Sequence, residues 1–198
     1  MRVLLLGANG MLACDLIREA PGAHDIVGRD IDDFDITDPH AVHEAVHEIQ
    51  PDLIVNAAAY TNVDGAESEP DLAFAVNGDA PGFIGSAAKA LGVPVVHYST
   101  DYVFDGSSRE PYGEDESTSP MGVYGASKLR GEHRLLDSGG SPHHPHAMVV
   151  RHRRSLVSAN HVEAGNQRRG NPSGRRSDRK AHLHGGFGEG DLGQSGAT

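Results

Sequence analysis

Short aliphatic runs alternate with longer amphipathic segments along the first 150 residues of the chain. Continuous apolar runs of this length are typical of strands whose sheet is covered by helices on both faces. We expect five strands, at Arg2–Leu6, His24–Val27, Asp52–Asn56, Val93–Tyr98 and Ala147–Val150. Strands that alternate with helices predict an α/β fold, here a Rossmann-like doubly wound parallel sheet.

Between the expected strands, apolar residues recur every three or four positions. This spacing predicts helices over residues 41–49, around 72–76 and over 84–91. Pro39 falls in the first turn of the first of these helices, where a missing N–H does no harm. Gly92 lies where the last one is expected to end, just before Pro94.

The alternating pattern stops after Val150. The remaining 48 residues contain six large apolar side chains and nine glycines, together with clusters of arginine and histidine. Such a composition cannot build a core and is typical of disorder. We therefore expect one folded domain over residues 1–150, with an incomplete sheet, and a basic, disordered Gly/Arg/His-rich tail over residues 151–198. Translation in a shifted reading frame is one hypothesis for the tail.

Charge is distributed unevenly between these two parts. Residues 1–150 hold 8 Lys and Arg against 24 Asp and Glu, a net charge of −16, whereas residues 151–198 hold 9 against 4, a net charge of +5. An acidic body repels nucleic acid, so we expect no nucleic-acid partner. The first apolar run stops at Gly7, too short for a signal sequence or a membrane span. A cytoplasmic protein that does not associate with membranes is expected.

Three histidines lie close together in the segment Pro142–His146. They have no partner ligands at a defined spacing, which a zinc site requires. We predict no metal site.

A glycine-rich turn joins the first strand to the first helix, as Gly7-Ala8-Asn9-Gly10. Gly7 permits a tight turn, and Gly10 lets the backbone approach a pyrophosphate. The following helix begins near Met11 and Leu12, and its N-terminus supplies free N–H groups. Strand, turn and helix in this order predict that residues 1–150 form an NAD(P)-binding domain.

The end of the second strand is where a dinucleotide places its adenosine ribose. Asp30 suits the free 2′-hydroxyl of NADH, whereas the neighbouring Arg29 suits the 2′-phosphate of NADPH. The sequence leaves the choice between NADH and NADPH open. Asp35 and Ile36 lie where the adenine is expected to rest.

A second motif follows the fourth strand, which ends in Ser99-Thr100-Asp101. Tyr124 and Lys128 are four residues apart, so on a helix their side chains share a face. An adjacent ammonium group is expected to lower the pKa of the Tyr124 phenol and to make it a proton donor or acceptor near neutral pH. Thr100, at the carboxyl end of a parallel strand, is expected to hold the substrate oxygen against that phenol.

These motifs resemble those of the extended short-chain dehydrogenase/reductases and, within them, the dTDP-4-dehydrorhamnose reductases. The more specific segments are Asn56–Pro70 and Ser99–Phe104, and the similarity covers about the first 150 residues. The family's next segment after Arg151 has no counterpart in His152–Leu156, so the resemblance implies a chain truncated after about residue 150.

The resemblance implies reduction of the C4 ketone of dTDP-4-dehydro-6-deoxy-L-mannose to dTDP-L-rhamnose with NADPH or NADH. Thr100, Tyr124 and Lys128 would be catalytic, and Thr100 and Asp101 would face the dTDP-sugar substrate. Together with the glycine turn, the implied cofactor contacts are Gly7, Gly10, Met11, Leu12, Asp30, Asp35, Ile36, Ala59, Tyr60, Thr61, Tyr98, Tyr124 and Lys128.

Several alternatives stay open. The basic tail could be a nucleic-acid or partner-binding arm, although Phe187 is its only aromatic residue. Loss of a substrate domain would leave a nucleotide-binding remnant that turns nothing over. An NDP-sugar epimerase or dehydratase of the same fold is a further alternative, because dehydratases place acidic residues beside the strand-end threonine, as in Thr100-Asp101. The sequence does not decide whether the chain forms a homodimer.

Overall fold

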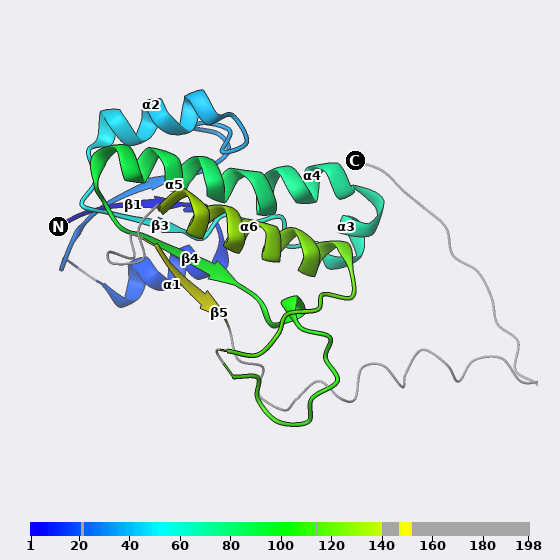
Figure 1. The fold of residues 1–198 in the computed structure, drawn as a ribbon. Helices are drawn as coiled ribbons and strands as arrows, with labels where there is room; N and C mark the ends of the chain where they lie inside the picture. Colours follow the sequence, from blue (N-terminus) through cyan, green and yellow to red (C-terminus); the bar gives the residue numbers. More distant parts are fainter. Residues whose placement is uncertain (21, 114, 140–146, 152–198) are drawn as a thin grey trace, which may run out of the picture. The chain divides into compact units, whose positions relative to one another are not determined.

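In the part of the chain that the structure describes, five parallel strands form one sheet (Figure 1). The structure is a computed structural model, and it describes residues 1–20, 22–113, 115–139 and 147–151. The strands are β1 (Arg2–Leu6), β2 (Asp25–Arg29), β3 (Leu53–Asn56), β4 (Val95–Ser99) and β5 (Ala147–Arg151), in the order β2-β1-β3-β4-β5. The predicted histidine cluster and nearly all of the predicted disordered tail lie outside these residues.

Helices cover the sheet on both faces, and this confirms the doubly wound α/β fold. The helical elements are α1 (Met11–Glu19), α2 (Pro39–Ile49), α3 (Val63–Ser68), α4 (Pro70–Ala73), the π-helical segment η1 (Phe74–Asp79), α5 (Ala80–Leu91), the 3₁₀ turn η2 (Asp101–Val103) and α6 (Val123–Gly139). Figure 1 shows α2, α5 and α6 on one face of the sheet and α1 on the other.

Local sequence sets the ends of these helices. Asp38 precedes α2, and its carboxylate accepts a hydrogen bond from the backbone N–H of His40 at 2.8 Å, which satisfies one of the free donors of the first turn. Gly92 ends α5 in the left-handed conformation, with φ of 70°. Within the described residues, none of the helices has both the length and the apolar character needed to cross a bilayer.

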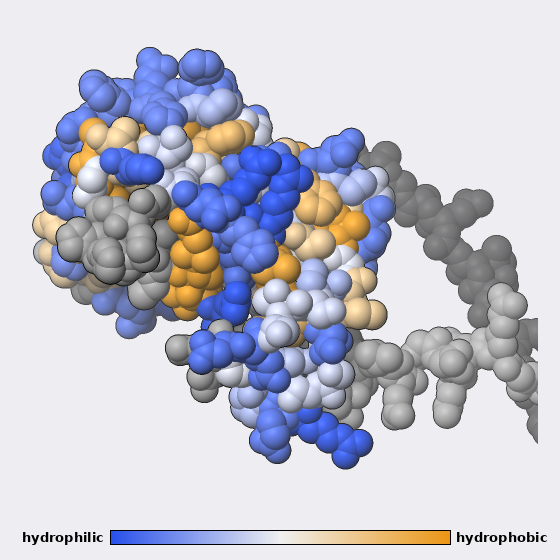
Figure 2. Space-filling model, in the orientation of Figure 1, coloured by the Kyte–Doolittle hydropathy of each residue, from blue (hydrophilic) through white to orange (hydrophobic). Residues whose placement is uncertain are grey.

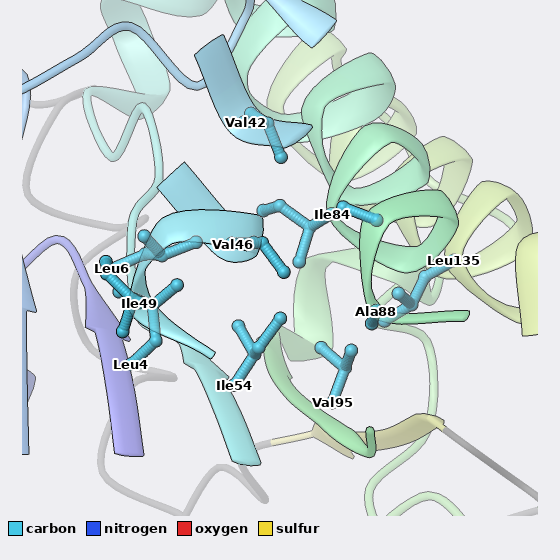
Figure 3. Packing of buried hydrophobic residues seen from close by; sticks show 11 residues of the cluster. Leu4, Leu6, Val42, Val46, Ile49, Ile54, Ile84, Ala88, Val95 and Leu135 are labelled. Carbon is cyan, nitrogen blue, oxygen red and sulfur yellow. The ribbon is translucent and has the colours of Figure 1, made fainter. Parts of the chain in front are cut away.

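The core lies between the sheet and the layer of α2, α5 and α6 (Figure 3). Its side chains point inward from both layers. The largest are Leu4 and Leu6 of β1, Ile54 of β3, Val95 of β4, Val42, Val46 and Ile49 of α2, Ile84 of α5 and Leu135 of α6. Burial of each side chain of this size contributes about 1.5–3 kcal/mol, so this layer anchors the strands whose carboxyl ends carry the site.

The observed elements differ from the prediction in several places. Strand β3 begins at Leu53, β4 spans Val95–Ser99 instead of 93–98, α3 was not predicted, and β5 includes Arg151, which the prediction assigned to the tail because its side chain is charged. Strand β2 runs from Asp25 to Arg29, further along the chain than the predicted 24–27, because its backbone continues to pair with β1 up to Leu6. The apolar groups around 72–76 and 84–91 belong to one helical path, since both Phe74 and Ala80 at the junctions are themselves helical. Pro81 lies within this path, just after the π-helical segment η1.

Candidate active site

The glycine turn is held at the carboxyl end of β1. Gly7 has a φ of +77°, and a Cβ on it would lie 2.7 Å from the backbone N and Cα of Ala58. Glycine is therefore needed here both for its conformation and for the close approach of the loop after β3. The backbone N–H of Gly10 donates to the Gly7 carbonyl at 3.0 Å, which closes the turn.

Helix α1 begins directly after this turn with a free N-terminus. Among the described residues, no side chain caps it, and its first turn carries no acidic residue. The first N–H bonded within the helix is that of Cys14, which donates to the Gly10 carbonyl at 3.0 Å. The N–H groups of Met11 and Leu12 therefore have no helical acceptor, as at any helix start. Their residues are 90% and 39% exposed, and this end fits a pyrophosphate.

Carboxylates gather at the neighbouring end of β2. Asp30 accepts hydrogen bonds from the backbone N–H of Asn9 and of Ile31, both at 2.8 Å, so its side chain is tied to the glycine turn. Asp33 accepts from the backbone N–H of Asp30 at 2.8 Å. The guanidinium of Arg29 donates to the Gly28 carbonyl at 3.0 Å. The two predicted ribose contacts thus lie at the same strand end. The Arg29 backbone carbonyl accepts from the N–H groups of Gly7 at 2.9 Å and Ala8 at 3.2 Å, whereas Asp30 is bonded to the turn through its side chain.

The two residues predicted near the adenine differ in environment. Asp35 is exposed and accepts from the backbone and hydroxyl of Thr37, both at 2.8 Å, in a local turn. Ile36 is half-buried and packs against the hydrophobic core. At least part of the Ile36 side chain therefore contributes to core packing.

Residues Ala59, Tyr60 and Thr61 follow β3, and Tyr60 is held by Asn77 of η1. The Asn77 side chain accepts from the Tyr60 N–H at 2.8 Å and donates to the Tyr60 carbonyl at 3.0 Å. Its amide nitrogen also lies 3.1 Å from the hydroxyl of Ser127 in α6. One buried amide thus joins the loop after β3 to the helix that carries Tyr124 and Lys128, and the sequence prediction missed it.

Thr100 and Tyr124 come together at the end of β4. The Thr100 side chain accepts from the backbone N–H of Tyr102 at 3.3 Å and hydrogen-bonds to Tyr124. The Thr100 hydroxyl also donates to Asp101 at 3.3 Å. The rings of Tyr102 and Tyr124 meet edge to face, with centroids 5.5 Å apart. The predicted catalytic threonine and tyrosine therefore lie in direct contact.

Gly125 allows α6 to come this close to η2. A Cβ at Gly125 would lie 2.2 Å from the Tyr102 carbonyl oxygen and 2.9 Å from its carbon, both backbone atoms. Any larger residue would push the start of α6, and Tyr124 with it, away from Thr100. The glycine inside the Tyr-x-x-x-Lys motif therefore has a steric function.

Lys128 is buried, with 2% exposure, and points toward β4. Its ammonium nitrogen lies 2.6 Å from the Tyr98 carbonyl oxygen and 3.5 Å from Nε2 of His97. Burial lowers the pKa of Lys128 to about 8, while the nearby charge of Glu132 acts in the opposite direction. The lysine therefore titrates much closer to neutral pH than an exposed lysine.

The predicted lowering of the Tyr124 pKa was wrong for this structure. Burial raises the pKa of the Tyr124 phenol, and the hydrogen bond with Thr100 opposes the rise only in part. The Lys128 nitrogen is bonded to the Tyr98 carbonyl, and Lys128 is not among the groups that shift the Tyr124 pKa. The Tyr124 hydroxyl is therefore protonated at neutral pH.

A buried carboxylate lies one helical turn beyond Lys128. Glu132 is 1% exposed, and both of its oxygens are bonded to Arg151 at the end of β5. The Ser99 hydroxyl also donates to Glu132. The sequence prediction missed this network, although the four-residue spacing of Lys128 and Glu132 is a detectable signal.

Comparison with known proteins places this geometry in context. Residues 1–161 match the family model described as RmlD substrate binding domain. A dTDP-4-dehydrorhamnose reductase of Burkholderia thailandensis is 44% identical over 140 residues, which are 71% of this chain and 47% of that relative. The chain thus spans about half the length of the curated relatives it matches.

Solved structures agree with this assignment. A dTDP-4-dehydrorhamnose reductase of Clostridium acetobutylicum superimposes with a TM-score of 0.72 at 36% identity, over 76% of this chain and 52% of that one. The enzyme of the same name from Bacillus anthracis, in complex with NADP, superimposes with a TM-score of 0.71 at 39% identity and the same coverage. The chain therefore belongs to the RmlD family, the family of the dTDP-4-dehydrorhamnose reductases.

Proposed function

We propose that the chain is the cofactor-binding and catalytic part of an NAD(P)H-dependent reductase that converts dTDP-4-dehydro-6-deoxy-L-mannose to dTDP-L-rhamnose. One observation carries the proposal. The hydrogen-bonded pair Thr100 and Tyr124, with Lys128 one helical turn away, lies at the same edge of the sheet as the glycine turn. Open parallel sheets bind ligands at this edge.

A reduced nicotinamide dinucleotide, when bound, supplies the hydride. The exposed turn and uncapped start of α1 suit its pyrophosphate, and Asp30 suits its adenosine ribose. The residues that we propose as cofactor contacts are Gly7, Gly10, Met11, Leu12, Asp30, Asp35, Ile36, Ala59, Tyr60, Thr61, Tyr98, Tyr124 and Lys128.

In the proposed reaction the hydride adds to C4 of the sugar, and a proton must reach the C4 oxygen. Tyr124 is suited to donate it, because burial raises the pKa of its phenol and keeps the hydroxyl protonated. We propose that the Thr100 side chain holds the same oxygen and that Asp101, which accepts from the Thr100 hydroxyl at 3.3 Å, faces the substrate. Lys128, one helical turn after Tyr124, supplies a group that can carry a proton or a positive charge.

The proposal includes a dTDP-sugar as substrate, a cytoplasmic location and no nucleic-acid partner. The net charge of −16 on residues 1–150 supports the last point, since nucleic acid is itself an anion. Whether two copies associate is decided by size-exclusion chromatography with light scattering.

A second candidate is cofactor binding without turnover. The observation that favours it is that the chain spans about half the length of the relatives it matches. A third candidate, an epimerase or dehydratase of the same fold, rests on Asp101 beside Thr100. The reductase, the epimerase and the binding-only chain differ in their products, which makes them separable in one assay.

The test incubates the purified chain with NADPH or NADH and dTDP-4-dehydro-6-deoxy-L-mannose and follows the absorbance of the reduced cofactor. Reductase activity gives sugar-dependent loss of absorbance and dTDP-L-rhamnose as product, and Tyr124→Phe, which removes one oxygen, abolishes both. A change in cofactor fluorescence without sugar-dependent oxidation would support the binding-only candidate. Formation of another sugar without net cofactor oxidation would support the epimerase. A dehydratase would leave this sugar, which has already lost its 6-hydroxyl, unchanged.

A further inference from the structure

His97 is a fully buried histidine that the proposed mechanism does not use. It lies on β4, is 0% exposed, and contacts buried groups on two other elements. Its Nδ1 is 3.0 Å from the side-chain nitrogen of Asn56 on β3, and its Nε2 is 3.5 Å from the Lys128 nitrogen on α6. The imidazole therefore lies between an amide and the predicted catalytic lysine.

The hydrogen bonds around Asn56 determine which nitrogen of His97 carries the proton. The backbone N–H of Ala58 can only donate, and it donates to Oδ1 of Asn56 at 3.1 Å. This fixes the orientation of the amide, so its nitrogen is the atom that faces His97. An amide nitrogen is a donor, and Nδ1 of His97 must therefore be the acceptor. The neutral ring then carries its proton on Nε2, on the side of Lys128.

This tautomer is mismatched with a protonated lysine. An ammonium group has three donors and no acceptor, so an Nε2–H group directed at it meets no lone pair. A neutral amine has a lone pair that can accept from Nε2–H. We propose that His97, fixed as the Nε2–H tautomer by Asn56, is a positioning residue for Lys128 that disfavours its ammonium form and orients the neutral amine. The inference rests on the proposed function in assigning a catalytic role to Lys128.

The other groups around Lys128 each favour either its ammonium form or its neutral form. On β4 the Tyr98 carbonyl accepts from the lysine and favours the ammonium. On α6 Glu132 also favours it, but both carboxylate oxygens are bonded to Arg151 of β5. Tyr124 lies one turn earlier on the same helix, and Asp101 of η2 acts on Tyr124. Burial and His97 are the effects that oppose the ammonium among the described contacts.

The low pKa of His97 supports the neutral Nε2–H tautomer. Burial and the nearby charge of Lys128 lower the pKa of His97 to about 3. The ring is therefore neutral throughout the pH range in which the lysine titrates. Its contribution to Lys128 is that of a fixed dipole and does not switch with pH.

NMR on the ¹⁵N-labelled chain tests the tautomer directly. We expect Nε2 of His97 to carry the proton and Nδ1 to have the shift of an unprotonated acceptor. A proton on Nδ1 overturns the inference. The measurement needs neither cofactor nor sugar, so its failure is distinguishable from failure of the proposed reductase activity.

Titration of the Lys128 side chain in two variants tests the effect on the lysine. His97→Phe removes the N–H group and retains a ring of similar size, so the Lys128 pKa should rise by about one unit, a tenfold change in proton affinity. Asn56→Leu removes the amide donor without adding a charge, so that the Nε2–H tautomer is no longer fixed, and it should raise the same pKa. Val96→Ile, on the strand next to His97 but on the opposite sheet face, is the control and should leave it unchanged. An unchanged Lys128 pKa in either folded variant contradicts the inference. So does a pH–rate profile whose apparent pKa does not shift together with the Lys128 pKa.

Discussion

The carboxyl edge of the sheet has two halves that are built differently. Around β1 and β2 the predicted ligand contacts are exposed backbone N–H groups and a carboxylate tied to the glycine turn. Around β4 and β5 they are side chains connected to the buried residues Lys128, Glu132 and His97 and to the partly exposed Arg151. Figure 2 shows the hydrophilic and hydrophobic residues interspersed on one face of the molecule.

The difference follows from what each half is proposed to do. Binding a pyrophosphate needs donors in a fixed geometry, which the backbone supplies at any pH. Moving a proton needs groups whose pKa values lie near the working pH, and burial provides this by penalising the charged form. In the first half, the choice of residues is therefore limited by the space around the backbone. In the second half, it is limited by how the surroundings shift the pKa values of the charged groups.

The largest effect is expected from Lys128→Met, which keeps the length of the side chain and removes its charge. Turnover in the proposed reaction should fall by about 10²- to 10⁴-fold, the usual contribution of a group that acts in proton transfer. The assay is cofactor oxidation in the presence of the sugar. Lys89→Met, on the exposed last turn of α5, is the matched control and should keep full activity.

The same lysine should make stability depend on pH. Its pKa is about 8 in the folded chain and 10.5 for an exposed lysine, so between these values the unfolded chain binds a proton that the folded chain does not. Stability should therefore rise with pH across this window, by up to about 3 kcal/mol. Urea unfolding from pH 7 to 10.5 measures the rise, which Lys128→Met should lack.

Gly7→Ala tests the half that is constrained by space. The new Cβ would meet the Ala58 backbone at 2.7 Å in a left-handed conformation, and the free energy of unfolding should fall by about 3 kcal/mol. Gly22→Ala separates the strain of the left-handed backbone from the clash with Ala58. Gly22 also has a positive φ, of +69°, but nothing lies within 4 Å of its Cβ position. Equal losses in both variants would show that the close approach to Ala58 is unimportant.

Glu132→Gln removes the charge at the centre of the buried network. It leaves the Arg151 cation without its partner, and the loss of stability should be about 2 kcal/mol, less than for a fully buried pair because the Arg151 side chain is 29% exposed. Asp15→Asn breaks the exposed ion pair with Arg18 and should cost well under about 1 kcal/mol. Similar urea midpoints for the two variants would contradict the expectation that the buried ion pair contributes more to stability than the exposed one.

The smallest effect is expected at the end of β2. Asp30→Ala removes the carboxylate proposed to face the adenosine ribose, and the ratio of NADH to NADPH affinity should shift about tenfold toward NADPH. Fluorescence titration with both cofactors gives the ratio. Asp32→Asn changes the charge by the same amount at an exposed neighbouring position and should leave the ratio nearly unchanged.

The sequence predicted the first half of the edge well and the second half in part. The turn from Gly7 to Gly10 could be predicted because it depends on residue type and order alone. Its glycines lie close to other backbone atoms, and a helix with a free N-terminus follows directly. Thr100 and Tyr124 were placed together correctly. The direction of the Tyr124 pKa was wrong, because it depends on burial. Glu132 and His97 were missed, since their partners come from strands distant in sequence.

Asn77 has a mechanical consequence for the whole edge. Its single amide is bonded to both backbone groups of Tyr60 and to the Ser127 hydroxyl, and it lies in the π-helical segment η1. The loop after β3 and helix α6 are therefore tied to one rigid point. A displacement of either segment must be transmitted to the other, and their amide protons should exchange with solvent in a single correlated opening.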